Sequence, residues 1–254
     1  MYCWGLNCMI DLIINWIISL IQKRKANKKS NNDSTITNID NIQKGEENML
    51  EFKIDGVPYY TQRDNKRYPH ISCFPTSLAM VMKYCLKQKG LTKADVGCAP
   101  EYQLEDYIDM LIDDDETKAW MLKNEGRLGS WIWKYRRRTI YAVEAYIFNR
   151  LMNRHGYEAL ARYDFNYQAI CNILRETGLP MVIGGNFSSV SRVKGHMNTL
   201  IGYNAIGLKE FIVHDPYGIA TTGYTNHNGE SVRYSSKFFK RDGDKIFCVY
   251  VKTI

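Results

Sequence analysis

A cysteine placed just before a predicted helix is the first candidate for chemistry in this chain. After Cys73 comes Pro75, which is well tolerated in a first helical turn, and then apolar residues follow at helical spacing. Unpaired N–H groups and the positive end of the helix dipole favour a thiolate there, and lower the thiol pKa from its free value of about 8.5. A single cysteine is more often buried and inert, so a nucleophilic role needs partner residues.

A thiolate nucleophile needs a base and a group that orients the base. His196 lies near the start of the apolar segment GHMNTLIGYN, and Asp215 lies near the end of the next one, EFIVHDPYG. A hairpin centred between residues 205 and 206 would place His196 directly opposite Asp215, within reach of a hydrogen bond. His214 would point to the opposite face of the same strand and ranks second as the base.

Acyl transfer also needs hydrogen-bond donors for the oxyanion that develops on the substrate. Gln62 stands eleven residues before Cys73 and offers a neutral amide N–H. The backbone N–H of Cys73 would be the second donor. Each of these residues alone is an ordinary polar group, but together they predict an acyl-transfer site.

The elements that must position these residues change in character along the chain. The expected helices cover residues 75–89, 101–112, 116–124, 130–155 and 167–177. The expected strands cover residues 181–184, 196–204, 210–215, 220–225, 231–234 and 245–252. Helices followed by an antiparallel sheet predict an α+β fold.

The order of these motifs resembles the papain-like cysteine peptidases of the bacteriocin-leader-processing type, and most closely their free-standing peptidase-like relatives. The matching stretches are VPYYTQRDN, SCFPTSLAMV, GHMNTLIGY and VHDPYG, and the resemblance covers about residues 54–254. It implies a papain-like fold, in which a helical lobe precedes an antiparallel β-sheet lobe. It also implies a Cys73–His196–Asp215 triad with Gln62 at the oxyanion hole.

Two features depart from that family. Phe74 stands where a small residue usually follows the nucleophile, so we expect it to crowd the site. The helical region between about residues 98 and 178 is longer than in leader peptidases, so the substrate cannot be transferred with the fold.

The N-terminal part of the chain differs from the rest. Residues 4–21 are mostly large and apolar with a narrow polar stripe, which predicts a hydrophobic helix over residues 1–22. This helix would lie on a membrane or self-associate, span a membrane once, or cap the folded domain. Lysines and an arginine follow this helix, so if it spans a membrane, the part of the chain that follows would lie on the cytoplasmic side. Residues 23–50 form an expected polar linker, and residues 51–254 the expected peptidase domain.

Composition limits the other possibilities. The average apolar and charged content excludes collagen-like, disordered and multi-span membrane classes, and the seven cysteines include no C-x-x-C pair. The net charge of +7 fits an anionic partner. The basic and aromatic segment 130–141 is best explained as a solvated helix face, so we do not expect nucleic acid. The acidic run 113–116 fits no calcium loop, and we expect no metal or cofactor.

We therefore expect a cysteine peptidase that hydrolyses a peptide or isopeptide bond through a thioester. A free-standing, basic form favours bacterial cell-wall peptide (peptidoglycan) as the substrate, as for a lysin, whereas the charges after the first helix favour a cytosolic peptide. The protein would then be membrane-associated, or cytoplasmic with later access to the cell wall. The alternatives are a catalytically inactive papain-like peptide-binding module tethered by its N-terminal helix, a leader-peptide-processing protease, and an enzyme that transfers the acyl group to an amine.

Overall fold

The computed structural model describes residues 51–125, 134, 140–205, 209–241 and 243–254. The predicted helix 1–22, the predicted linker 23–50 and most of the basic segment 130–141 lie outside the described residues. Within the described part of the chain, no helix has the length and apolar character needed to cross a membrane.

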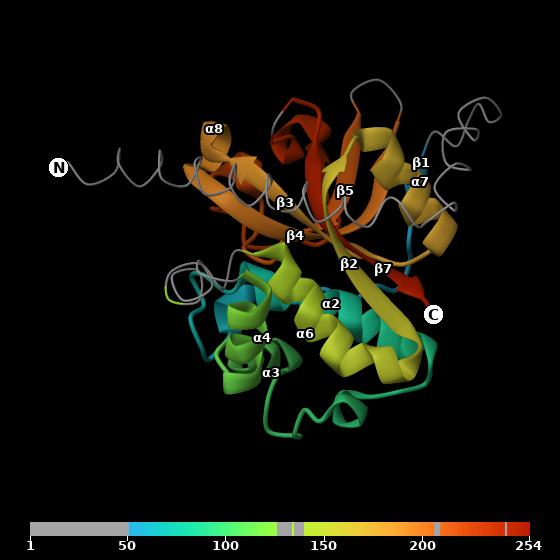
Figure 1. The fold of residues 1–254 in the computed structure, drawn as a ribbon. Helices are drawn as coiled ribbons and strands as arrows, with labels where there is room; N and C mark the ends of the chain where they lie inside the picture. The colour runs from blue at the N-terminus through green and yellow to red at the C-terminus, as the bar shows by residue number, and fades with distance from the viewer. Residues whose placement is uncertain (1–50, 126–133, 135–139, 206–208, 242) are drawn as a thin grey trace. The chain divides into compact units, whose positions relative to one another are not determined.

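Helices dominate the first half of the described chain (Figure 1). They are α2 (Cys73–Gln88), α3 (Leu104–Ile112), α4 (Asp115–Glu125), α6 (Tyr141–Met152) and α7 (Tyr167–Thr177), with a single turn α8 (Ser188–Ser191) later in the chain. Short 3-10 turns cover Gln62–Asp64, Lys93–Val96, Asn153–His155, Ala220–Thr222 and Ser236–Phe239.

Seven strands form one antiparallel sheet, and all of them except the first lie in the second half of the described chain. They are β1 (Glu51–Lys53), β2 (Tyr157–Phe165), β3 (Met181–Phe187), β4 (Val193–Asn204), β5 (Glu210–His214), β6 (Val232–Ser235) and β7 (Ile246–Thr253). The sheet order is β2-β7-β3-β4-β5-β6, and β1 pairs with β4. The expected α+β fold, with helices before an antiparallel sheet, is confirmed.

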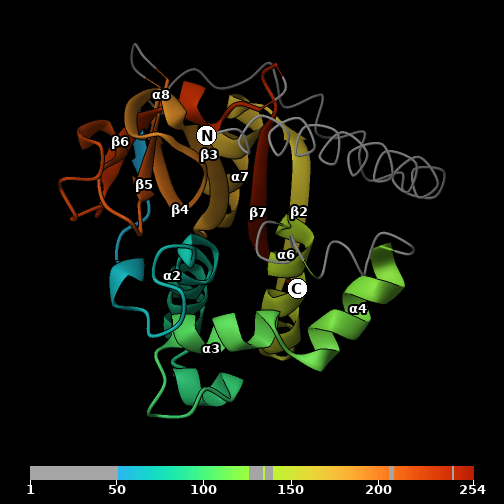
Figure 2. The ribbon, with the colours of Figure 1, turned by 90° about the vertical axis from the view of Figure 1, so that its left-hand side faces the viewer.

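Helix α2 is the central element of the helical side. Twelve of its side chains are buried, including Phe74, Leu78, Met82 and Leu86, because apolar residues occupy nearly every face. It packs against α3, α6, β3 and β4. Figure 2 shows α2, α3 and α4 in the lower part and β4, β5 and β6 in the upper part, and α2 contacts the sheet through β3 and β4.

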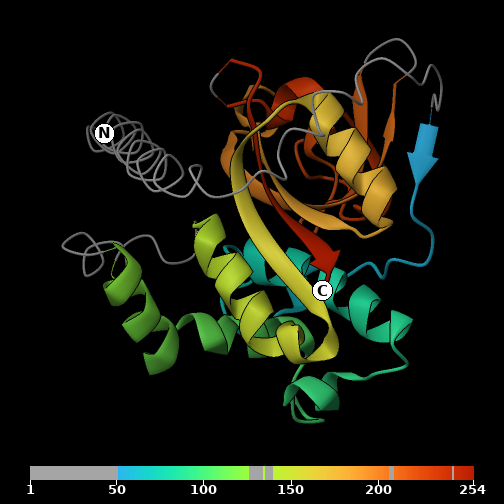
Figure 3. The same ribbon diagram turned by 45° about the vertical axis from the view of Figure 1, so that its right-hand side comes forward.

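Two sequence predictions about elements are wrong. Residues 220–225 do not form a strand, because Ala220–Thr222 form a 3-10 turn that ends at Gly223 in a left-handed conformation. Residues 157–165 were not expected to be extended, yet they form β2, which pairs with β7 and lies along α6 (Figure 3). Apolar and polar residues alternate there, which is the pattern of a half-buried strand.

Candidate active site

Cys73 is the first residue of α2, and its side chain is partly exposed. Burial alone would raise the pKa of the thiol, but a hydrogen bond with His196 and the charge of that imidazole lower it below its ordinary value. Backbone N–H groups of Met197 and Phe74 add to this lowering. These donors favour the thiolate, which is the reactive form of cysteine.

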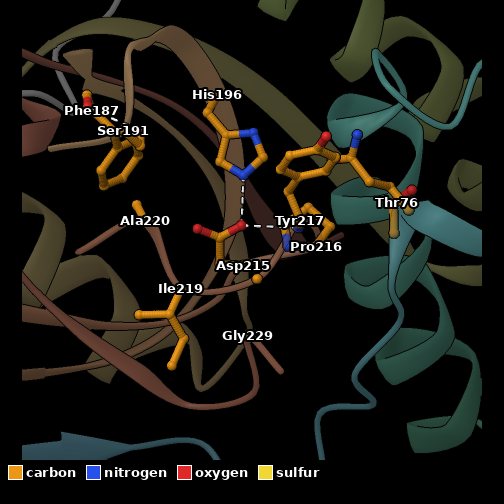
Figure 4. Close-up of polar contacts among 12 residues, drawn as sticks. Thr76, Phe187, Ser191, His196, Asp215, Pro216, Tyr217, Ile219, Ala220 and Gly229 are labelled. Carbon is orange, nitrogen blue, oxygen red and sulfur yellow. Dashed lines mark hydrogen bonds and ion pairs between the residues drawn. The ribbon is translucent and has the colours of Figure 1, made fainter. Parts of the chain in front are cut away.

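His196 is a buried residue of β4, and its side chain forms a hydrogen bond with Cys73 at the start of α2. Its Nε2–H donates to Oδ1 of Asp215 at 2.6 Å (Figure 4), so Nδ1 is the nitrogen left for Cys73. Burial lowers the pKa of His196, but Asp215 and Cys73 outweigh that effect and raise it to about 10. The two shifts together favour a thiolate–imidazolium pair.

Asp215 is fully buried, directly after β5. Besides His196, its Oδ1 accepts the backbone N–H of Tyr217 at 3.0 Å, and its Oδ2 accepts the hydroxyl of Tyr234 at 2.9 Å. Three donors therefore hold the carboxylate in one orientation, which fixes the imidazole in turn.

The register that brings His196 and Asp215 together differs from the predicted one. The hairpin pairs Thr199 with His214 and Asn204 with Glu210, and a bulge separates Leu200 from Gly202. His196 therefore has no partner in β5, and the prediction that it lies directly opposite Asp215 is wrong. The contact forms because Asp215 follows the end of β5, where the chain turns.

Gln62 begins a 3-10 turn and is 1% exposed. Its backbone N–H donates to the carbonyl of Pro216 at 2.8 Å, which ties it to the residue after Asp215. Its side-chain Nε2 donates to the carbonyl of Pro69 at 2.8 Å. An amide NH₂ has two hydrogens, and the bond to Pro69 uses one of them.

Two other residues were weighed from the sequence. The side chain of Phe74, which follows Cys73, is fully buried and belongs to the hydrophobic core. His214 accepts the backbone N–H of Ser231 at Nδ1, and its Nε2–H donates to the carbonyl of Val57. With both nitrogens bound to backbone, His214 has a structural role.

Sequence reasoning missed Tyr217, Tyr234 and Glu144. Tyr217 lies in the DPYG stretch, whose proximity to Asp215 was a usable signal, whereas the approach of Tyr234 depends on the pairing of β5 with β6. Glu144 on α6 is fully buried, and burial together with the charge of Cys73 raises its pKa well above the ordinary value. This shift favours the neutral form of Glu144, which puts no negative charge near the thiolate.

No group of three or more His, Cys, Asp or Glu side chains that could hold a metal ion occurs among the described residues. A cavity of about 360 Å³ lies beside the segment that leads to Gln62. Its lining includes Tyr60, Lys83, Lys93, Gln103 and Glu105. Cys73, His196 and Asp215 do not line this cavity.

Comparison with known proteins gives one family and several structures. The model of the Peptidase_C39 like family matches residues 54–240. The structure is similar to UfSP from C. elegans, with 16% identity over 84% of this chain and 36% of that chain and a TM-score of 0.47. It is also similar to a recombinant stem bromelain precursor (15% identity, 80% and 70% of the chains, TM-score 0.41). The bromelain protease from Ananas comosus, solved with the E64 inhibitor, has 14% identity, coverage of 81% and 99%, and a TM-score of 0.39.

The chain thus spans about a third of the length of UfSP. No curated protein sequence matches it.

Proposed function

The chain belongs to the Peptidase_C39 like family and is a cysteine peptidase, and from this premise we propose that Cys73, His196 and Asp215 form its catalytic triad. The observation that carries the proposal is the position of His196. Its Nε2–H donates to the Asp215 carboxylate, and its other nitrogen is left for Cys73. A nucleophile, a base and an orienting carboxylate are thereby connected in series.

The first half of the reaction forms a thioester. The Cys73 thiolate attacks the carbonyl carbon of the scissile peptide or isopeptide bond, and the carbonyl oxygen becomes an oxyanion. The free amide hydrogen of Gln62 and the backbone N–H of Cys73 stabilise that charge. The imidazolium of His196 then donates its Nδ1 proton to the leaving nitrogen, the C–N bond breaks, and the amine departs.

The second half releases the acid. His196, now neutral, accepts a proton from a water molecule, and the resulting hydroxide attacks the thioester carbonyl. The C–S bond breaks, the carboxylic acid leaves, and the thiolate–imidazolium pair forms again. Asp215 stays charged throughout and stabilises the imidazolium in both halves.

The substrate class is a narrower part of the proposal. The net charge of +7 supports an anionic polymer such as bacterial cell-wall peptide, and membrane contact through residues 4–21 would bring the enzyme to a surface. A leader peptide remains the alternative substrate. A catalytically inactive module that binds peptide without cleaving it is the other alternative.

The test uses the full chain with Cys73→Ala, and with Cys85→Ala as a control that removes a thiol from the core side of the same helix. Each protein is incubated with cell-wall sacculi and with a peptide library, and new termini are identified by mass spectrometry. We expect cleavage by wild type and Cys85→Ala, and none by Cys73→Ala. Equal cleavage by Cys73→Ala would exclude Cys73 as the nucleophile, and no cleavage by any protein would favour the binding module.

A further inference from the structure

Arg63 lies next to the proposed catalytic groups with most of its hydrogen-bond donors unused. It follows Gln62 in the 3-10 turn and is partly exposed. Its guanidinium carbon lies 3.9 Å from the centroid of the Tyr217 ring, and its Nε–H donates to the Tyr217 carbonyl at 2.9 Å. These two contacts hold the guanidinium over the ring, so less side-chain entropy is lost when a ligand binds.

Tyr217 connects Arg63 to the catalytic imidazole. The ring centroids of Tyr217 and His196 are 6.4 Å apart in an edge-on arrangement, and Figure 4 shows the Tyr217 ring beside the imidazole. The Tyr217 backbone N–H also donates to Asp215. Tyr217 therefore lies between Arg63 and His196 in a row of neighbouring side chains.

Neither Tyr217 nor His196 neutralises the charge of Arg63. Across the described residues, Arg63 has no carboxylate within ion-pair distance, whereas Arg67, Arg150, Arg162 and Arg233 each pair with at least one. A guanidinium has five N–H donors in a planar fork that fits a carboxylate with two parallel hydrogen bonds. Only the Nε–H of Arg63 is used within the described part of the chain. The two Nη groups are thus available to a ligand.

We propose that Arg63 determines specificity by binding a carboxylate of the substrate on the leaving-group side of the scissile bond. This inference rests on the proposed function, because the leaving nitrogen must receive its proton from His196. The substrate residues that follow that nitrogen then run past Tyr217 to Arg63. The distance from the His196 ring to the Tyr217 ring is 6.4 Å, and the distance from that ring to the Arg63 guanidinium is 3.9 Å. Together they span at most about three extended residues at roughly 3.3 Å each, so the acidic group lies within the first three residues after the cleaved bond.

The first experiment profiles the sites that the full chain cleaves in a peptide library. Wild type, Arg63→Gln and Arg63→Glu are compared, with Arg162→Gln as the control. Arg162 is matched because it also stacks on an aromatic ring, that of Phe165, but it lies on the edge strand β2. We expect Asp and Glu to be enriched in the first three positions after the cleaved bond for wild type and Arg162→Gln. The enrichment is lost in Arg63→Gln, and Lys and Arg replace the acids in Arg63→Glu.

The second experiment measures kcat/KM on matched peptides taken from that profile. One pair differs by Glu against Gln at the preferred position, and another by a free carboxylate against an amide at the C-terminus. We expect a preference of roughly tenfold for the charged member of one pair, and a ratio near one in Arg63→Gln, as for a single hydrogen-bonded ion contact. A preference in the first pair means that Arg63 binds a side-chain carboxylate of the substrate. A preference in the second pair means that it binds the C-terminal carboxylate.

The outcomes separate the two proposals. If peptides are cleaved in a Cys73-dependent manner but the charged and neutral members react equally in wild type, Arg63 has only a structural role and the inference is overturned. The same conclusion follows if Arg63→Gln lowers both members equally. If no peptide is cleaved by wild type, the proposed function itself fails and this inference fails with it.

Discussion

At the scale of single residues, the surroundings of each cysteine decide its chemistry. Burial raises the pKa of Cys85 and Cys171 to about 12 and also raises those of Cys98 and Cys248, whereas the pKa of Cys73 is lowered. The sequence alone predicted that the thiolate of Cys73 is favoured, because Cys73 stands at the start of a predicted helix. The larger effect comes from His196, which is more than a hundred residues away and becomes a neighbour only in the folded chain.

Removing the charge of Asp215 should weaken the ion pair. In Asp215→Asn the imidazolium loses its main stabilising partner, so the pKa of His196 falls below about 10 and the thiol pKa rises. We expect the alkaline limb of the kcat/KM–pH profile to move to lower pH and the maximal kcat to fall at least about tenfold. Asp164→Asn, on an exposed ion pair, serves as the control. An unchanged alkaline limb would show that Asp215 does not act on the imidazole.

Removing the Gln62 amide should affect the acyl-transfer step alone. We expect Gln62→Ala to lower kcat by about 10² to 10³, the usual loss for one oxyanion donor. Alkylation of Cys73 by iodoacetamide should keep its rate, because that displacement forms no oxyanion. Gln168→Ala, at an exposed position of α7, is the matched control. A parallel loss of alkylation would mean that Gln62 only supports the local structure.

At the scale of elements, local pattern predicted most helices and strands but not how they pair. The bounds of α7 were predicted to the residue, because Asn166 caps its start and Gly178 ends it. The register of β4 with β5 was missed because Asn204 pairs with Glu210, three residues beyond the expected partner, and the bulge between Leu200 and Gly202 shifts the pairing by only one residue. The role of Tyr234 was missed for a related reason, since it depends on the neighbour of β5 in the sheet.

The loop after β5 should be sensitive to a single methyl group. Gly229 accepts the backbone N–H of Asp215 at 2.8 Å, and a Cβ added to Gly229 would lie 2.0 Å from the Asp215 carbonyl oxygen. We expect Gly229→Ala to lower the free energy of unfolding by about 1–3 kcal/mol, because backbone must move to relieve the clash. We also expect kcat to fall, because the Asp215 carboxylate is displaced.

Urea denaturation and peptide cleavage measure the two effects. Gly195→Ala is the control for stability, because a Cβ at Gly195 meets nothing within 4 Å. Equal stability of Gly229→Ala and wild type would contradict the close approach of Gly229 to Asp215.

At the scale of the whole described molecule, the site is built where the helical part meets the sheet. The start of α2 supplies the thiol and β4 supplies the imidazole, and the hydroxyl of Thr199 on β4 donates to the carbonyl of Ser77 on α2 at 3.0 Å. The types and order of residues in the sequence predicted the triad that we propose. They could not predict the distances within it, because these depend on packing between segments far apart in the chain.

The most direct test of the account is the rate at which Cys73 is alkylated at pH 6. The full chain, as wild type and as His196→Ala, is treated with limiting iodoacetamide, and each cysteine is quantified by peptide mapping. A denatured sample, in which access is equal, provides the reference. We predict that Cys73 of wild type reacts at least about tenfold faster than Cys85 and Cys98, and that His196→Ala abolishes this advantage although access to Cys73 is unchanged. If Cys73 reacts no faster than those thiols, or reacts as fast without His196, the thiolate–imidazolium pair does not exist.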